Sequence, residues 1–160
     1  MKKLIVVIFL SLILSGCTTY RPQYDADYEK AVSAVIDKSS ETIKFNDHAY
    51  WYPNRSVMEY TFSTIEGNLL VTNKTLYFLQ WDTEANSYNV VKKIPISNIK
   101  NAKIVSYGIN KFASIQSAGD HFDIFTFVYD VAGIKSDQNK EMSEYINSLI
   151  KKSPVVPERH

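Results

Sequence analysis

The feature that most constrains the fold is a series of short strand patterns that begins near residue 57. Met58, Tyr60 and Phe62 alternate with polar residues, as expected for a strand with one buried face. The whole chain contains 11 Tyr, 8 Phe and 2 Trp but only 5 Gly and 5 Pro. Because aromatic and β-branched residues are enriched in strands, pattern and composition both predict a sheet-rich domain.

The strand patterns continue as far as residue 129. Predicted strands cover 69–72, 75–81, 88–94, 102–107 and 112–117, with turns at 66–68, 73–74 and 108–110, a polar loop over 82–87 and a strand end at Pro95. The run 121–129 begins with Phe122 and Ile124 on one face but continues with Phe125 and Phe127 on the other. Either a bulge shifts its phase or both of its faces are covered.

Helical spacing appears on both sides of the strand region. Tyr28, Val32 and Ile36 predict an amphipathic helix over 25–38, which packs its apolar stripe on the domain. Met142 and Ile146 belong to a second helix over 138–152. Ser136 or Asp137 is placed to cap the start of this second helix. Strands followed by a closing helix predict an α+β fold.

An aromatic cluster lies between the first helix and the strands. Residues 39–41 predict a turn, and residues 48–53 predict a strand or a surface platform that carries Tyr50, Trp51 and Tyr52. These three side chains are candidate binding residues, because Tyr and Trp suit boundaries that are partly wet and partly apolar. The alternative is that the cluster plugs one end of the core.

The first residues predict export from the cytoplasm. Lys2 and Lys3 precede a mainly apolar run over 4–14, and small residues follow up to Cys17. This order is that of a secretory signal. The apolar run is well short of the roughly 20 residues that a helix needs to cross a hydrocarbon core, so a permanent span is the weaker interpretation.

Residues 14–17, Leu-Ser-Gly-Cys, resemble the lipobox of bacterial lipoproteins. The resemblance implies cleavage after Gly16 and acylation of Cys17, and several acyl chains hold a protein firmly to a membrane. Thr18 stands where retention in the inner membrane typically requires Asp. The resemblance therefore implies sorting through Thr18 to the outer membrane, on its periplasmic face.

Composition limits the remaining chain to one domain without disulfides. Cys17 is the only cysteine, so no cystine can form within the chain. Roughly 130 residues follow the anchor and its flank, enough for one sizeable core. Removal of Lys2 and Lys3 takes the formal net charge from +1 to −1. Nucleic acid is therefore not expected as a partner, because that role requires a strongly basic face.

Residues 66–79, 93–99 and 125–127 together resemble GRAM and related pleckstrin-homology-like (PH-like) domains. The resemblance covers 57–152 and implies a strongly bent antiparallel sheet of about seven strands, a PH-like barrel capped by the C-terminal helix. Phosphoinositide sites of pleckstrin type need clustered basic residues in the first strands. Here Glu59 and Glu66 have only Lys74 nearby, so phosphoinositide recognition is not expected.

These patterns divide the chain into five segments. The segments are a lipoprotein signal peptide (1–16), the lipidated cysteine with its tether (17–24), the N-terminal helix and connecting segment (25–56), the GRAM/PH-like domain (57–152) and a disordered tail (153–160).

No residue set predicts catalysis, a metal or a cofactor. The histidines are His48, His121 and His160. Asp120, His121 and Asp123 could ligate a divalent ion, but strand alternation sends His121 and Asp123 to a solvated face. The chain also lacks the glycine–serine–glycine, phosphate-loop and HExxH motifs.

The sequence leaves three functional hypotheses, because fold does not fix function. The first is a membrane-anchored, non-catalytic binding or scaffolding module for an envelope protein or lipid, acting through a sheet edge or the aromatic cluster. The second is a carrier that holds a lipid or apolar molecule between sheet and helix. The third is a hydrolase, which needs a concave pocket holding His48 or His121 beside a carboxylate.

Lysines recur along the later half of the chain. They are Lys92, Lys93, Lys100, Lys103, Lys151 and Lys152. A basic side facing anionic lipid or cell-wall polymer is one use for them, and a scattered solvated face is the other.

Overall fold

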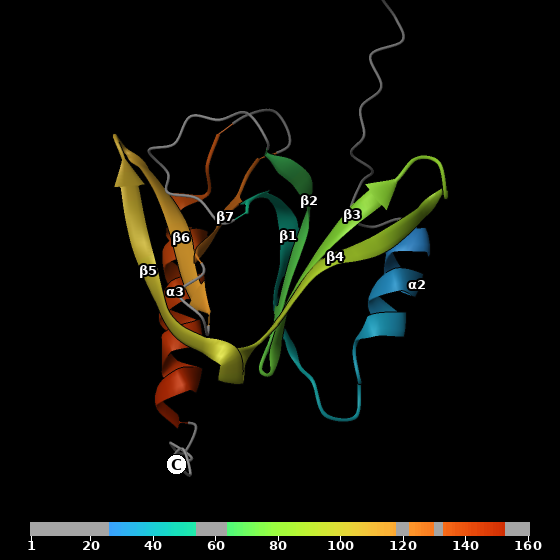
Figure 1. Ribbon diagram of the computed structural model, residues 1–160, viewed down its shortest axis with the longest axis horizontal. Helices are drawn as coiled ribbons and strands as arrows, with labels where there is room; N and C mark the ends of the chain where they lie inside the picture. Colours follow the sequence, from blue (N-terminus) through green and yellow to red (C-terminus); the bar gives the residue numbers. More distant parts are fainter. Residues whose placement is uncertain (1–25, 54–63, 118–121, 130–132, 153–160) are drawn as a thin grey trace, which may run out of the picture.

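Seven strands form one bent antiparallel sheet in the computed structural model, which describes residues 26–53, 64–117, 122–129 and 133–152 (Figure 1). The elements are α2 (Ala26–Val35), β1 (Ile43–Tyr52), β2 (Ile65–Thr72), β3 (Thr75–Asp82), β4 (Ser87–Pro95), η1 (Ile96–Asn98), β5 (Ile99–Tyr107), β6 (Asn110–Ser117), β7 (Phe122–Phe127) and α3 (Ser136–Lys152). The strand order is β4-β3-β2-β1-β7-β6-β5. The predicted α+β fold, with a helix before and after the sheet, is confirmed.

The predicted turn at 66–68 is wrong, because these residues lie inside β2. Gly67 pairs with Ala49 of β1, and β3 passes close to it on the other side. A Cβ atom at Gly67 would lie 2.3 Å from the carbonyl oxygen of Leu79 and 2.7 Å from the Phe78 ring. This glycine permits a close backbone approach, which a single sequence does not distinguish from a turn. The strand predicted around Met58 lies outside the described residues.

The mixed pattern of β7 arises because both faces of the strand are covered. Five of its six residues, from Asp123 to Phe127, are buried, and only Phe122 is exposed. The pairings of β7 with β1 and β6 show no register shift, so the alternative of a bulge is wrong. The predicted solvated position of Asp123 is also wrong, since this residue is 2% exposed.

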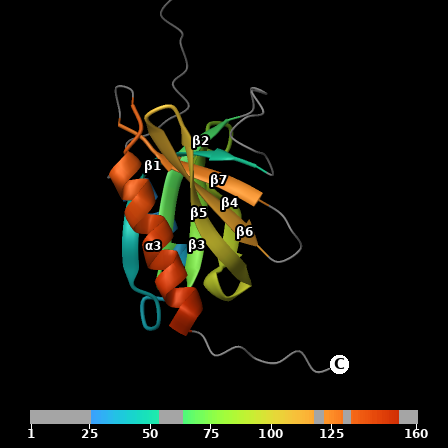
Figure 2. The same ribbon diagram turned by 90° about the vertical axis from the view of Figure 1, so that its left-hand side faces the viewer.

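The main core lies between the sheet and α3, which runs along β5, β6 and β7 (Figure 2). Met142 and Ile146 of α3 are completely buried against the sheet. Aromatic rings fill much of the space, with Trp51 stacked on Phe125 at 6.3 Å between ring centroids. Phe78 lies 5.8 Å from Trp51 and 6.1 Å from Phe125. The sheet therefore encloses a packed aromatic interior.

The helix α2 covers part of the opposite face of the sheet. Its apolar stripe, Tyr28, Val32 and Ile36, packs in a second cluster with Leu70, Tyr77, Leu79 and Tyr88. The Tyr28 hydroxyl also donates a hydrogen bond to the Asn46 side chain. The helix predicted over 25–38 is confirmed, although the regular helix ends at Val35. In the described part of the chain, neither α2 nor α3 has the length and apolar character needed to span a bilayer.

Substitution Gly67→Ala tests the close approach of β2 to β3. We expect a loss of about 3 kcal/mol in the free energy of unfolding, because the new methyl group overlaps a backbone oxygen. The control Gly108→Ala meets no atom within 4 Å, although its φ of +59° favours glycine. We expect this control to cost about 1 kcal/mol from backbone strain. Urea denaturation measures both values, and equal losses would contradict the predicted overlap.

Candidate functional site

The alternation of β1 separates the three aromatic residues predicted to bind. Trp51 points into the core and is 8% exposed, whereas Tyr50 and Tyr52 lie on the outer face and are half-buried. A strand sends successive side chains to opposite faces, so the three rings cannot form one platform. The prediction of a strand here is confirmed, and the binding role remains a prediction. Cys17 and Thr18 lie outside the described residues.

Trp51 belongs to a polar contact inside the core. Its indole Nε1 donates to the carboxylate of Asp123 at 2.8 Å, and Lys92 Nζ lies 2.8 Å from the other carboxylate oxygen. The same ammonium group lies 5.3 Å from the centre of the Trp51 ring. A buried carboxylate needs such partners to offset its desolvation. This contact joins β1, β4 and β7, so the role of Asp123 is to hold these three strands together.

The described residues contain no group of three or more His, Cys, Asp or Glu side chains that could hold a metal ion. Asp120 and His121, considered above as metal ligands with Asp123, lie outside those residues. The Asp123 carboxylate is engaged by Trp51 and Lys92.

A polar and aromatic surface lies on the outer face of β1 and β2. We name it the β1 patch, and it consists of His48, Tyr50, Tyr52 and Glu66. His48 Nε2 lies 3.0 Å from Glu66 Oε1, and the Tyr50 ring meets the His48 ring edge-on at 5.8 Å. Tyr52 packs edge-on against Phe112 of β6 at 6.2 Å. The patch combines two phenols with one carboxylate.

The tyrosines of the β1 patch remain neutral at physiological pH. Burial raises the pKa of Tyr50 above its usual value of 10.0, and the negative charge of Glu66 raises it further. Burial also raises the pKa of Tyr52, with a second contribution from Tyr50, although a hydrogen bond with Thr64 acts in the opposite direction. Neutral phenols donate and accept hydrogen bonds. The patch can therefore form polar contacts through both hydroxyls.

His48 lies beside a carboxylate, which is one of the two conditions stated above for a hydrolase. Its ring is nevertheless deeply buried, since His48 is only 4% exposed. A general base must come within hydrogen-bond reach of the proton that it removes. Of the pair, only Glu66, whose side chain is 33% exposed, offers an accessible group.

Asn68 is a polar residue that the sequence prediction assigned to a turn. It lies within β2, opposite His48 and Leu79, and is completely buried. Neither its amide nitrogen nor its amide oxygen has a hydrogen-bond partner in the described part of the chain. A buried polar group without a partner costs on the order of 1–3 kcal/mol, so such groups are few in native proteins.

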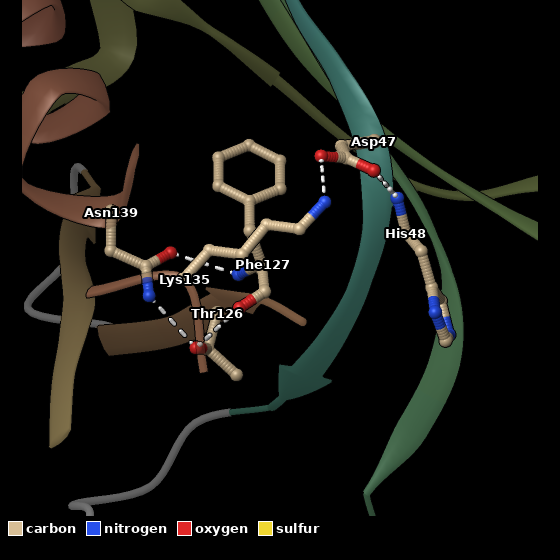
Figure 3. Close-up of polar contacts among 6 residues, drawn as sticks. All are labelled: Asp47, His48, Thr126, Phe127, Lys135 and Asn139. Atoms are coloured by element: carbon tan, nitrogen blue, oxygen red, sulfur yellow. Dashed lines mark hydrogen bonds and ion pairs between the residues drawn. The ribbon is translucent and has the colours of Figure 1, made fainter. Parts of the chain in front are cut away.

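A second polar network joins α3 to the sheet (Figure 3). Asn139 accepts a hydrogen bond from the backbone N–H of Phe127 at 2.8 Å and donates to Thr126 Oγ1 at 2.9 Å. It also donates to the carbonyl oxygen of Lys111 at 2.8 Å. The regular pairing of β6 with β7 stops at Ala113 and Phe125. Beyond this pair, the Asn139 side chain takes the place of the backbone hydrogen bonds between Lys111 and Phe127.

Figure 3 also shows Asp47 between Lys135 and the backbone of His48. Asp47 forms an ion pair with Lys135 at 2.5 Å and accepts the backbone N–H of His48 at 2.9 Å. Lys135 Nζ lies 5.2 Å from the centre of the Tyr129 ring. Lys135, the residue before α3, is thus fixed to β1. Ser136, predicted as a cap, begins α3, and its hydroxyl accepts the backbone N–H of Lys111.

Both outer edges of the sheet carry features that oppose the addition of another strand. In β4, the pairing with β3 shifts at Phe78 and Leu79, which leaves Val91 as a bulged residue, and Pro95 lacks an N–H group. On β5, the Asn147 side chain accepts the N–H of Ala102 at 3.0 Å and donates to its carbonyl oxygen at 2.6 Å. Bulges, proline and covered edges all hinder pairing with another chain.

Comparison with known proteins places the domain among PH-like folds. The fold is similar to the hSac2 domain of the human phosphoinositide phosphatase Sac2, with a TM-score of 0.52 and 13% identity over 77% of this chain and 78% of that chain. It is also similar to the linker-DH/PH domains of p115-RhoGEF, with a TM-score of 0.51 and 10% identity over 83% of this chain and 36% of that chain. The present chain therefore matches only about a third of that p115-RhoGEF chain. No family model and no curated protein matches the sequence. At these identities the similarity shows the fold, and the chain has the PH-like fold that the resemblance implied.

Substitution Asn139→Ala tests the network between α3 and the sheet. We expect a loss of about 3 kcal/mol in the free energy of unfolding, because the buried N–H of Phe127 and the carbonyl of Lys111 lose their partner. The control Asn147→Ala affects the partly buried edge at Ala102, where water can replace the amide, and should cost about 1 kcal/mol. Hydrogen exchange at the Phe127 amide locates the effect. Unchanged exchange in Asn139→Ala would contradict this role.

Proposed function

We propose that this chain is a lipid-anchored envelope protein whose PH-like domain binds a protein partner and has no catalytic step. The fold supports a binding module, since its architecture is that of PH-like domains. The observation that carries the proposal is the β1 patch, where two neutral tyrosines lie beside Glu66 on one outer face.

The anchor rests on the sequence before the domain. An apolar run after Lys2 and Lys3 leads to the lipobox-like residues 14–17. Cys17 would carry acyl chains, and Thr18 favours the outer membrane with the domain on its periplasmic face. Short tethers of this kind keep a domain near the membrane without a transmembrane helix.

A protein partner suits the β1 patch better than it suits the sheet edges. The edges of β4 and β5 are obstructed by the bulge at Val91 and by Asn147. Tyrosine is enriched in protein interfaces because its ring provides large contact area and its hydroxyl forms hydrogen bonds. The carboxylate of Glu66 makes anionic ligands such as phosphate unfavourable at this surface.

The interior and the buried histidine argue against the two alternatives. A carrier would hold its ligand between sheet and α3, but Trp51, Phe78 and Phe125 occupy the space beside the fully buried Met142. A hydrolase would need His48 or His121 within reach of its substrate; the His48 ring is 4% exposed, and His121 lies outside the described residues. Binding at the surface requires neither a cavity nor an accessible base.

Mass spectrometry of the full chain purified from bacterial membranes tests the anchor. We expect the mature chain to begin at Cys17 with attached acyl chains, and Cys17→Ser to lose both processing and lipid. Thr18→Asp should keep the lipid but move the protein to the inner-membrane fraction in a Gram-negative host. A mature chain with an unmodified Cys17 would contradict the anchor, and unchanged fractionation of Thr18→Asp would contradict the sorting.

Photocrosslinking in intact cells tests the binding surface. With benzoylphenylalanine in place of Tyr50, we expect a discrete protein adduct, because the ring lies in the proposed contact. The matched control places the same group at Val91, which is 40% exposed on the edge strand β4. Tyr50→Ala should weaken partner binding at least tenfold, as loss of a tyrosine hot spot does. Equal adducts from both positions would contradict a site on β1.

A further inference from the structure

The turn between β5 and β6 exposes a large apolar side chain to solvent. Ile109 is 92% exposed, and Tyr107 beside it is 46% exposed. Gly108 adopts a φ of +59°, which allows the tight turn. We name Tyr107, Gly108 and Ile109 the β5–β6 tip. An apolar residue at the end of a protruding hairpin is costly in water and suits insertion into an apolar layer.

The two strands that form the β5–β6 tip carry lysines and no acidic residue. From Ile99 to Ser117 the two strands carry Lys100, Lys103 and Lys111, and no Asp or Glu. Lys103 is exposed and Lys111 is partly buried, whereas Lys100 lies at the start of β5, away from the tip. Each lysine near an anionic bilayer contributes favourably to binding at its surface. The apolar tip suits the acyl region of a bilayer, and the lysines behind it suit the anionic head groups.

The β5–β6 tip is held rigidly by α3. The backbone N–H of Lys111, two residues after Ile109, donates to Ser136 Oγ at 3.1 Å. The carbonyl oxygen of Lys111 accepts from Asn139 at 2.8 Å. Because these bonds fix the base of the turn, little conformational entropy remains to be lost when the tip meets another surface.

A second exposed aromatic residue lies near the same end of the domain. Tyr129, between β7 and α3, is 58% exposed, and its ring lies beside Lys135. In both ribbon views the start of α3 and the β5–β6 tip lie toward the same end of the domain (Figures 1 and 2). Lys111 and Ser136 connect the two segments directly. Tyrosine favours the boundary between water and lipid.

The length of the tether limits how far the domain can lie from the bilayer. Nine residues lead from Cys17 to Ala26, the first residue of α2. A fully extended chain of this length spans about 30 Å. The first turn of α2 is directed toward the upper end in Figure 1, where the β5–β6 tip also lies, but α2 itself stands on the flank of the β3–β4 turn. A lipid on Cys17 therefore keeps the domain close to the membrane, and the surface of the domain decides which part meets it.

We propose that the β5–β6 tip and Tyr129 contact the lipid leaflet that holds Cys17, with Lys103 and Lys111 against anionic head groups. This inference rests on the proposed lipid anchor. The acyl chains supply the attachment, and the tip fixes the orientation of the domain. The β3–β4 turn lies on the opposite flank in Figure 1 and carries Asp82 and Glu84, so this turn is not attracted to anionic lipid.

A depth measurement on the full lipidated chain tests the contact. Once Cys17 is acylated, Ile109→Cys supplies the only free thiol in the chain, which can carry a nitroxide spin label. The chain is placed in vesicles of phosphatidylethanolamine containing phosphatidylglycerol. We expect the label at 109 to be accessible to oxygen and protected from a water-soluble nickel relaxant. The control Ser97→Cys lies in η1, at the other end in Figure 1, and should show the reverse.

Charge variants test the contribution of the head groups. In an unlipidated chain that lacks residues 1–16 and carries Cys17→Ser, Lys103→Gln should weaken binding to the same vesicles about fivefold, and Ile109→Asp about tenfold or more. Lys38→Gln, an exposed lysine after α2, is the matched control and should change binding little.

The outcomes separate this inference from the proposed anchor. A lipidated chain whose label at 109 is as exposed to nickel as the label at 97 would refute the membrane contact and leave the anchor intact. A chain that carries no lipid at Cys17 would refute the anchor. Equal vesicle binding by Ile109→Asp and the parent chain would also refute the contact.

Discussion

Where β6 and β7 separate, the side-chain amide of Asn139 forms the hydrogen bonds that the two strands no longer give each other. A bent sheet must open at some point, and buried N–H and carbonyl groups at the opening need partners. Asn147 has the same role at the free edge of β5. Two amides on one helix therefore allow the sheet to bend around α3. The aromatic interior, the fixed start of α3 and the rigid β5–β6 tip all depend on this arrangement.

Because side chains fill the interior of the domain, both candidate binding sites lie on its surface. Trp51 lies in the core together with its partners Asp123 and Lys92, and its neighbours on β1 face outward. One strand thus contributes both to the stability of the domain and to its candidate binding surface. The β1 patch and the β5–β6 tip differ in chemistry. The first combines phenols with a carboxylate, and the second combines an apolar turn with lysines, so a protein partner and a lipid surface can be engaged by separate parts of the domain.

Most helices and strands could be predicted from the sequence because their periodicity is local. The helix around Met142 and the strands on either side of Asn73 follow from spacing and turn residues alone. Gly67 and Asn68 were assigned to a turn, because glycine and asparagine are typical of turns. They lie inside β2, where a glycine is required because the neighbouring strand leaves no room for a Cβ atom at position 67. That constraint comes from Phe78 and Leu79, and no local pattern contains it.

The candidate site was only partly visible in the sequence for the same reason. Tyr50 and Tyr52 could be selected as binding residues, but their pairing with His48, Glu66 and Phe112 depends on strand register. The prediction for Asp123 failed because alternation gives the two faces of a strand without telling which face is covered.

The sequence by itself determined the α+β class, the seven-strand rhythm and the expectation of an anchor at Cys17, since each is written in consecutive residues. Tertiary structure decided which aromatic rings are buried, which polar groups meet, and that the exposed Ile109 stands on the same end as the start of α3. These features join residues far apart in the chain, such as Trp51 with Asp123 and Lys111 with Ser136. Contacts of this kind arise from packing, and packing is a property of the whole fold.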